Sequence, residues 1–390
     1  MIILNSKVYK NYLEILAYVF VFSLCFDKLN VFGINLDYLF TKITMSLLIF
    51  FSLFDLNFWN LNSKCSKFTV VLLLYFLTLT FSSYLNITIG YTTYFDYLFF
   101  LNILVFHSLV NIFSKRMAVL NNALFYFSIG NIVLTFFYFL GIGQVEMPDE
   151  LAGRATIFGY NQNFLGLSLT VSSLVILYNL YTQKYNLIKK LFYGISFLLV
   201  MYFMVTTGSR TAFVAFILGL STMLVLNHKI SAVTKIGFFL FFLTIMIFTY
   251  IFFLEDIAIL QRLTDSFLSG DTANRDVIWT GLFYFFSDYI FFGVGKTGYA
   301  RIIGDLSPHN VLIEIFIYTG LIGLFIFIYL IKAFFSNALS VFRNHNNILP
   351  LIIFIPFFGI LLTGQLFDQK VIWFFMACLT QTTKISISNE

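Results

Sequence analysis

The stretch SPHNVLIEIFIYTGLIGL, residues 307–324, sets a polar helix start directly before a long apolar run. We expect Ser307 to be the N-cap and Pro308 to occupy the first helical position. His309 and Asn310 would then lie in the first turn, where amide groups lack partners within the helix and the dipole adds positive charge. An anion binds favourably at such a place. The same field disfavours a charged histidine, so His309 is predicted to be neutral and able to accept a proton.

The composition indicates an all-α polytopic membrane protein. Apolar residues make up 60% of the chain and charged residues 11%, whereas soluble domains carry about 25% charged residues. We predict one integral membrane domain, residues 1–390, with a long outer loop at 255–308 as its main segment outside the membrane. The three cysteines are scattered and indicate neither a disulfide framework nor a metal site. No basic cluster predicts nucleic-acid binding.

Apolar runs of spanning or near-spanning length predict about twelve membrane helices, with the long loop between the ninth and the tenth. The first run has no small-residue cleavage site, so we interpret it as a retained helix. The last two runs are short and are predicted to form a hairpin around residues 364–369. The runs cover approximately 12–26, 38–56, 68–86, 95–113, 117–140, 163–182, 188–206, 210–227, 236–254, 309–332, 348–363 and 370–381.

The distribution of basic residues predicts that both termini are cytoplasmic. With the N-terminus inside, fourteen of the 23 lysines and arginines fall in inner segments and nine in outer ones, as the positive-inside rule expects. Five of the seven arginines nevertheless lie on the outer side. The guanidinium group presents a planar fork of donors that suits phosphate, so these arginines are candidates for anion binding. They are Arg154, Arg210, Arg262, Arg275 and Arg301.

Arg154 and Arg210 lie next to predicted helix starts. Arg154 closes an outer loop, and Asn161 or Asn163 is expected to cap the following helix. Arg210 follows a very tight turn in which Ser209 is expected to be the cap, and this turn leaves the arginine little freedom, as a preorganised charge clamp requires. The alternative is an interfacial, snorkelling arginine at both positions.

The long loop supplies further candidates. Asp271 is predicted to start an interfacial helix carrying Arg275, which would hold a lipid diphosphate or only cover the outer surface. Lys296 and Arg301 follow a glycine-rich turn. Pairing with outer carboxylates is an alternative role, especially for Arg262 and Arg301.

Glu314 lies four residues after Asn310, on the same helix face and about one turn into the membrane. An ionisable group at that depth usually faces the protein interior or a wet cavity. His309 is the one histidine predicted to face outward, because His107 is expected to be buried and the other two lie in inner loops; a structural role is the alternative. No carboxylate pair has glycosidase or metal-ligand spacing, which favours chemistry without metal or cofactor.

Several features occur together in one order: Arg154 ahead of Asn161 and Asn163, the turn GSRTAF at 208–213, a long outer loop, and SPHNVLIEIFIYTGLIGL at 307–324. In this combination the chain resembles the bacterial O-antigen polymerase and ligase superfamily, most closely over residues 150–330.

The resemblance implies a fold of about twelve helices similar to type C membrane glycosyltransferases, in the bacterial inner membrane. It implies a donor glycan linked through diphosphate to undecaprenol, transferred at the periplasmic face with inversion and without metal. Arg154, Arg210 and Arg275 would hold the diphosphate, with Arg262 competing for the role of Arg275, and His309 would orient or deprotonate the acceptor hydroxyl. Asn163, Lys296, Arg301, Asn310 and Glu314 are further substrate-binding candidates. Membrane lipid, a chain-length regulator and a flippase of the same pathway are the implied partners.

Three functional readings remain open. We favour a polymerase, which extends a lipid-linked repeat unit, over a ligase, which transfers the glycan to lipid A-core. The rival from another class is a lipid-linked oligosaccharide flippase or other transporter. It predicts ionisable groups along the membrane midplane, where Glu314, His107 and Asp96 are the few candidates, and an internal repeat, which is not visible. A third reading is a non-catalytic assembly or sensor protein.

Overall fold

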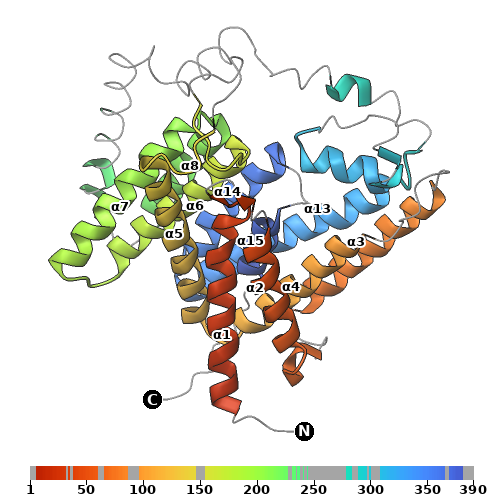
Figure 1. Ribbon diagram of the computed structural model, residues 1–390, viewed down its shortest axis with the longest axis horizontal. Coiled ribbons are helices and arrows are strands. Elements are labelled where there is room, and N and C mark those ends of the chain that lie inside the picture. The colour runs from red at the N-terminus through yellow and green to blue at the C-terminus, as the bar shows by residue number, and fades with distance from the viewer. Residues whose placement is uncertain are drawn as a thin grey trace.

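Helices account for nearly all regular structure in the part of the chain that the computed structural model describes (Figure 1). One short antiparallel pair, β1 (Asn30–Val31) with β2 (Ile34–Asn35), accompanies them. The described residues are 6–31, 34–35, 38–59, 66–86, 96–145, 154–226, 231–233, 235–237, 240, 244, 278–282, 289–296, 298–299, 308–364 and 369–380.

Eleven of the twelve predicted apolar runs correspond to described helices, and the run 236–254 lies almost wholly outside the described residues. Most of the predicted loop 255–308 lies outside them too. Two short 3-10 helices follow α1 and α2: η1 (Leu24–Phe26) and η2 (Leu56–Trp59). The α-helices are α1 (Ser6–Ser23), α2 (Leu39–Ser52), α3 (Ser66–Leu85), α4 (Tyr97–Phe113), α5 (Met117–Phe139), α6 (Gln162–Thr182), α7 (Leu187–Thr206), α8 (Arg210–Leu226), α13 (Val311–His345), α14 (Leu349–Thr363) and α15 (Lys370–Leu379).

Helix length and hydropathy support a polytopic membrane protein. Among the described residues, five helices are long and apolar enough to cross a membrane, namely α3, α5, α6, α7 and α13. Five shorter apolar helices, α2, α4, α8, α14 and α15, accompany them. The total of twelve spans stays a prediction.

Contacts between helix ends define two faces of the bundle. α1 begins near one face of the bundle and ends near the other. α2 to α8 then cross between the two faces in alternating directions. The contacts of the face that we call the site face join Asp27 to Lys370, Lys28 to Gly159 and Arg154 to Thr207. The contacts of the opposite face join Asp55 to Lys115 and Met117 to Asn347.

The start of α13 differs from the sequence prediction. Asn310, not Ser307, is the N-cap, because its side-chain oxygen accepts hydrogen bonds from the amides of Leu312 (2.9 Å) and Ile313 (3.2 Å). His309 has a left-handed backbone with φ of 49°, which is incompatible with a helical first turn. The prediction that Pro308, His309 and Asn310 lie in the first turn is therefore wrong, although His309 still lies directly beside the helix start.

α13 extends past the predicted end at residue 332 to His345, and its backbone is broken at Gly320 (φ 62°, ψ −160°). The carbonyl of Ile317, freed by the break, accepts a hydrogen bond from the amide of Val294 at 2.8 Å. The amide of Leu321 donates to the carbonyl of Ile290 at 2.8 Å. Segment 289–294 therefore satisfies backbone groups that the interrupted helix cannot.

α14 lies between α8, which begins at Arg210, and α13, whose start directly follows His309 and Asn310. It packs against α6 and α8 on one side and against α13 on the other (Figure 1). Close packing with α6 and α8 is possible at Gly359, where an added Cβ would lie 3.0 Å from Leu167 and 3.2 Å from Thr211.

Candidate functional site

Arg154 is held against the turn between α7 and α8. Its Nε donates a hydrogen bond to the carbonyl of Thr207 at 3.0 Å, and its Nη2 donates to Asn163 Oδ1 at 3.4 Å. The backbone follows the same path, because the amide of Ala155 donates to the carbonyl of Thr206 at 2.8 Å. Two segments about 50 residues apart in sequence are thus joined by backbone and side-chain bonds.

The turn itself is shaped around Arg154. Gly208 has a φ of +63°, and a Cβ added there would lie 3.0 Å from Arg154 Cγ. The residue must therefore be glycine both for its left-handed backbone and for the space that the arginine occupies. Ser209 then caps α8 by accepting a hydrogen bond from the amide of Ala212 at 3.3 Å, and Arg210 opens the helix. The predicted cap and helix start are confirmed here.

Asn161 and Asn163, at the start of α6, make different contacts. Asn161 caps the helix by accepting hydrogen bonds from the amides of Asn163 (3.0 Å) and Phe164 (3.2 Å). Asn163 instead accepts the bond from Arg154. We call the resulting set, Arg154, Asn163 and residues 207–210, the arginine cluster.

The arginine cluster suits an anion. Arg154, Asn163 and Arg210 are all half-buried, so a charge bound beside them is partly removed from water. Electrostatic interactions strengthen as the surroundings become less polar. The start of α8 adds amide groups and a favourable dipole to the guanidinium groups.

The start of α13 forms the second part of the candidate site. His309 is half-buried in a left-handed conformation that non-glycine residues seldom adopt, and such strain is often found at functional sites. The carbonyl of Pro308, just before it, accepts a hydrogen bond from Trp279 Nε1 at 2.9 Å. Asn310 uses its side-chain oxygen to cap the helix. Its predicted contact with substrate, and the catalytic role of His309, stay predictions.

Glu314 lies in the first turn of α13 and is only 3% exposed. Burial, and then the nearby charge of Glu314, raise the pKa of Tyr299. Tyr299 also packs edge-on against Tyr318, with ring centroids 5.4 Å apart. Nothing in the sequence distinguishes these two tyrosines among the 23 of the chain.

Lys296 has a defined partner in the structure. Its Nζ lies 2.7 Å from Asp96 Oδ2, and its amide donates to Ser83 Oγ at 3.3 Å. It therefore ties segment 289–296 to the ends of α3 and α4, and its predicted binding of substrate stays untested. Arg262, Arg275 and Arg301 lie outside the described residues, and of the predicted interfacial helix only residues 278–282 are described, which are helical.

An ion pair that the sequence analysis did not anticipate lies on the site face. Lys370 Nζ contacts both carboxylate oxygens of Asp27, at 2.8 and 3.0 Å, and the two side chains are only 11% and 7% exposed. Thr41 Oγ1 donates to the same carboxylate. The Lys370 ammonium also lies over the ring of Tyr38, 4.6 Å from its centroid.

His107 is buried, as predicted, and belongs to the opposite face. Its ring nitrogens contact Thr69 Oγ1 at 2.9 Å and the carbonyl of Phe58 at 2.6 Å. These contacts join α3, α4 and the connection after α2, which is a structural use of the histidine. Asp96 likewise lies at a helix end, where it caps α4 through a bond from the amide of Phe99.

Comparison with known families adds independent support. Residues 195–328 match the model of the O-antigen ligase family. This match confirms the resemblance to the O-antigen polymerase and ligase superfamily, and it supports a glycosyltransferase-type membrane enzyme of surface polysaccharide biosynthesis. The matched part contains Arg210, His309 and Glu314, whereas Arg154 and Asn163 precede it. No curated protein matches the chain.

Proposed function

We propose that this protein is a surface polysaccharide polymerase of the bacterial inner membrane, with both termini cytoplasmic and the site face periplasmic. It transfers a glycan from undecaprenyl diphosphate to a sugar hydroxyl of a lipid-linked repeat unit. The observation that carries the proposal is the bond from Arg154 to the turn that ends in Arg210, because it gathers two cations beside a helix start. Chain-length regulators and a flippase would act with it in the same pathway.

The arginine cluster fits the leaving group. A diphosphate departs with negative charge, and each well-placed donor to such developing charge typically contributes about 2.7–4 kcal/mol. Arg154 is already fixed by Thr207 and Asn163, so little rearrangement is needed when the donor binds. In this proposal guanidinium groups supply the positive charge that a divalent cation supplies in many other glycosyltransferases.

The start of α13 fits the acceptor. An acceptor oxygen attacks the anomeric carbon from the face opposite the diphosphate, which inverts the configuration. The bond from that carbon to the diphosphate oxygen breaks, and its electron pair leaves with the lipid diphosphate. His309, directly before the helix start, takes the proton of the acceptor hydroxyl. α14 packs against both α8 and α13 and so holds the donor and acceptor parts in a fixed relation.

Purified protein supplied with lipid-linked repeat units in the presence of a chelator tests the proposal. A ladder of glycan lengths on a gel is expected for the wild type, and its loss for Arg210→Ala and His309→Ala. Arg343→Ala, an exposed arginine in the last turn of α13, is the matched control and should retain the ladder. Wild-type ladders from both site variants at equal expression would contradict the proposal.

Ligation is the second candidate, and it is favoured by the family description that matches residues 195–328. The same assay separates the two reactions. A polymerase forms ladders from repeat units alone, whereas a ligase forms product only when lipid A-core is supplied.

A flippase is less compatible with where the ionisable groups lie. Two of the three midplane candidates have structural partners, since His107 contacts the carbonyl of Phe58 and Asp96 pairs with Lys296. In cells, a flippase variant would accumulate untranslocated lipid intermediate inside, whereas a polymerase variant would leave single repeat units on the surface.

A further inference from the structure

The loop that carries Arg154 has a second attachment, at Tyr160. The Tyr160 hydroxyl donates to the carbonyl of Cys25 at 3.3 Å and accepts a hydrogen bond from the amide of Lys28 at 3.1 Å. Lys28 Nζ donates to the carbonyl of Gly159 at 3.2 Å. Thr156 Oγ1 closes the loop on itself by donating to the carbonyl of Tyr160 at 2.6 Å. The loop is therefore fixed at one end to the α7–α8 turn and at the other to the end of α1.

This second attachment rests directly on the buried ion pair. Asp27 lies between Cys25 and Lys28, the two residues whose backbone holds Tyr160. It accepts hydrogen bonds from Lys370 at the start of α15 and from Thr41 in α2. Two helices, α2 and α15, thus contact the carboxylate of Asp27, which directly follows η1. Removing a charge from water is costly, and a buried pair holds its partners in one arrangement because a lone charge there is strongly unfavourable.

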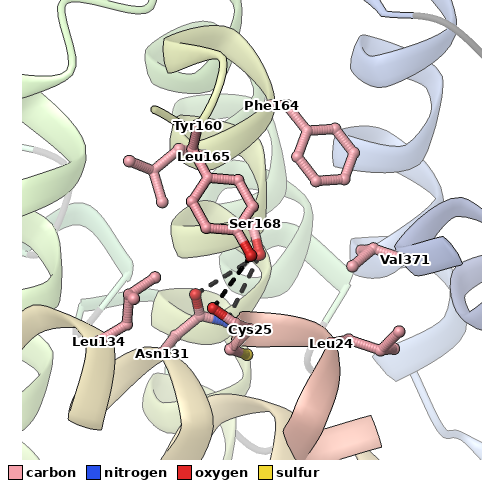
Figure 2. A pocket seen from close by; sticks show the side chains of 9 residues that line it. All are labelled: Leu24, Cys25, Asn131, Leu134, Tyr160, Phe164, Leu165, Ser168 and Val371. Carbon is pink, nitrogen blue, oxygen red and sulfur yellow. Dashed lines mark hydrogen bonds between the residues drawn. The ribbon is translucent and has the colours of Figure 1, made fainter. Parts of the chain in front are cut away.

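Polar contacts, in addition to apolar packing, hold the loop that carries Arg154 in its position. Figure 2 shows Tyr160 and Ser168 directed toward Asn131 and Cys25 around a small cavity. The cavity is small, with room for roughly one water molecule. In the same loop, Phe158 (φ 52°) and Gly159 (φ 69°) are consecutive left-handed residues, a conformation that is unfavourable for Phe158. Polar contacts therefore act together with the buried side chains of Ile157 and Phe158 to set the position of the loop.

We infer that Tyr160 and the buried Asp27–Lys370 pair are positioning residues for Arg154. They hold the loop so that the guanidinium group meets the Thr207 carbonyl and lies ready for the diphosphate of the donor. The inference rests on the proposed function, and it adds three residues that all lie outside the part that matches the family model.

A purely structural role makes a different prediction. If these residues only stabilise the fold, their variants lower the amount of active enzyme, which reduces the apparent kcat but leaves KM unchanged. If they position Arg154, the KM for the lipid diphosphate donor rises and the KM for the acceptor does not. Misplacement of a catalytic group by about 1 Å can lower rates by about 100-fold, so a fall in donor kcat/KM of at least about tenfold is expected.

The experiment compares Tyr160→Phe and the double variant Asp27→Asn/Lys370→Met, in detergent-purified full-length protein. The double variant removes both charges, so neither is left buried alone. The control is Asp55→Asn/Lys115→Met, because that pair has a similar distance (3.0 Å) and side-chain exposure (11% and 19%) on the opposite face. Tyr160→Phe removes a single hydroxyl, which keeps the test decisive even if the double variant fails to fold.

We expect the two site-face variants to raise the donor KM. Lys370→Arg keeps the positive charge beside Asp27 and should therefore keep the wild-type donor KM. The control pair should keep the wild-type donor KM. Unchanged donor KM in both site-face variants, while Arg154→Ala raises it, overturns this inference and leaves the proposed function intact. Wild-type donor kinetics in Arg154→Ala itself overturn both.

Discussion

Replacing Gly208 with alanine perturbs the arginine cluster without replacing a charged residue. The new Cβ would lie 3.0 Å from Arg154 Cγ and 3.2 Å from its Nε, where ordinary contacts begin at 3.4 Å. Arg154 must therefore move by a few tenths of an ångström, and this strains its 3.0 Å bond to the Thr207 carbonyl. A hydrogen bond from a charged group contributes about 1.5–3 kcal/mol, so weakening it should lower donor kcat/KM by about tenfold. The left-handed backbone costs a further 1–2 kcal/mol or so of stability.

The matched control is Gly141→Ala. Gly141 also has a left-handed backbone (φ +75°), but an added Cβ would meet nothing within 4 Å. Both variants should therefore lose similar thermal stability, measured by a melting assay in detergent. Initial rates of glycan transfer at varied donor concentration then isolate the contact with Arg154. Equal donor kcat/KM in the two variants would refute the reasoning that Arg154 acts from this position.

Three further predictions follow from the helix ends and the break in α13. Asn310→Ala removes the cap of α13 and should lower the free energy of unfolding by about 1 kcal/mol. Asn186→Ala, at the start of α7 on the opposite face, should have a similar effect on stability. Loss of transferase activity is expected only for Asn310→Ala. Gly320→Ala should prevent recovery of monodisperse protein in size-exclusion chromatography, because its Cβ would lie 2.3 Å from backbone atoms of Phe291; normal elution would show that the break can relax. The pKa of Asp55 is lowered overall. Burial alone would raise this pKa, but hydrogen bonds from Asn57 and Lys115 outweigh the effect of burial. This stabilisation is present above the unfolded pKa and is lost as pH falls below about 4, so the melting temperature of Asp55→Asn should depend less on acid than that of the wild type.

Hydropathy predicted the helices well because each apolar run had to satisfy its own backbone within the membrane. Local choices were harder. Residues 307–310 offer two possible capping side chains, Ser307 and Asn310, and the left-handed conformation of His309, which precedes the Asn310 cap, is not visible in sequence. The break at Gly320 depends on segment 289–294, whose approach to α13 no local pattern reveals.

The candidate site was predictable to the extent that motifs lay near helix starts. Ser209, Asn161 and Arg210 behave as their spacing predicts, and Arg154 joins them through Thr207. The Asp27–Lys370 pair was out of reach, because its partners are 343 positions apart and only the assembled bundle brings them together.

Release of undecaprenyl diphosphate is the most direct test of the central claim that the arginine cluster stabilises a departing diphosphate. Purified protein is mixed with lipid-linked repeat units, and the freed lipid diphosphate is counted against the glycosidic bonds formed. The account predicts one released per bond, with the initial rate lowered about 100-fold or more in Arg154→Ala and in Arg210→Ala. Release at the wild-type rate by both variants, with equal amounts of folded protein, would contradict it.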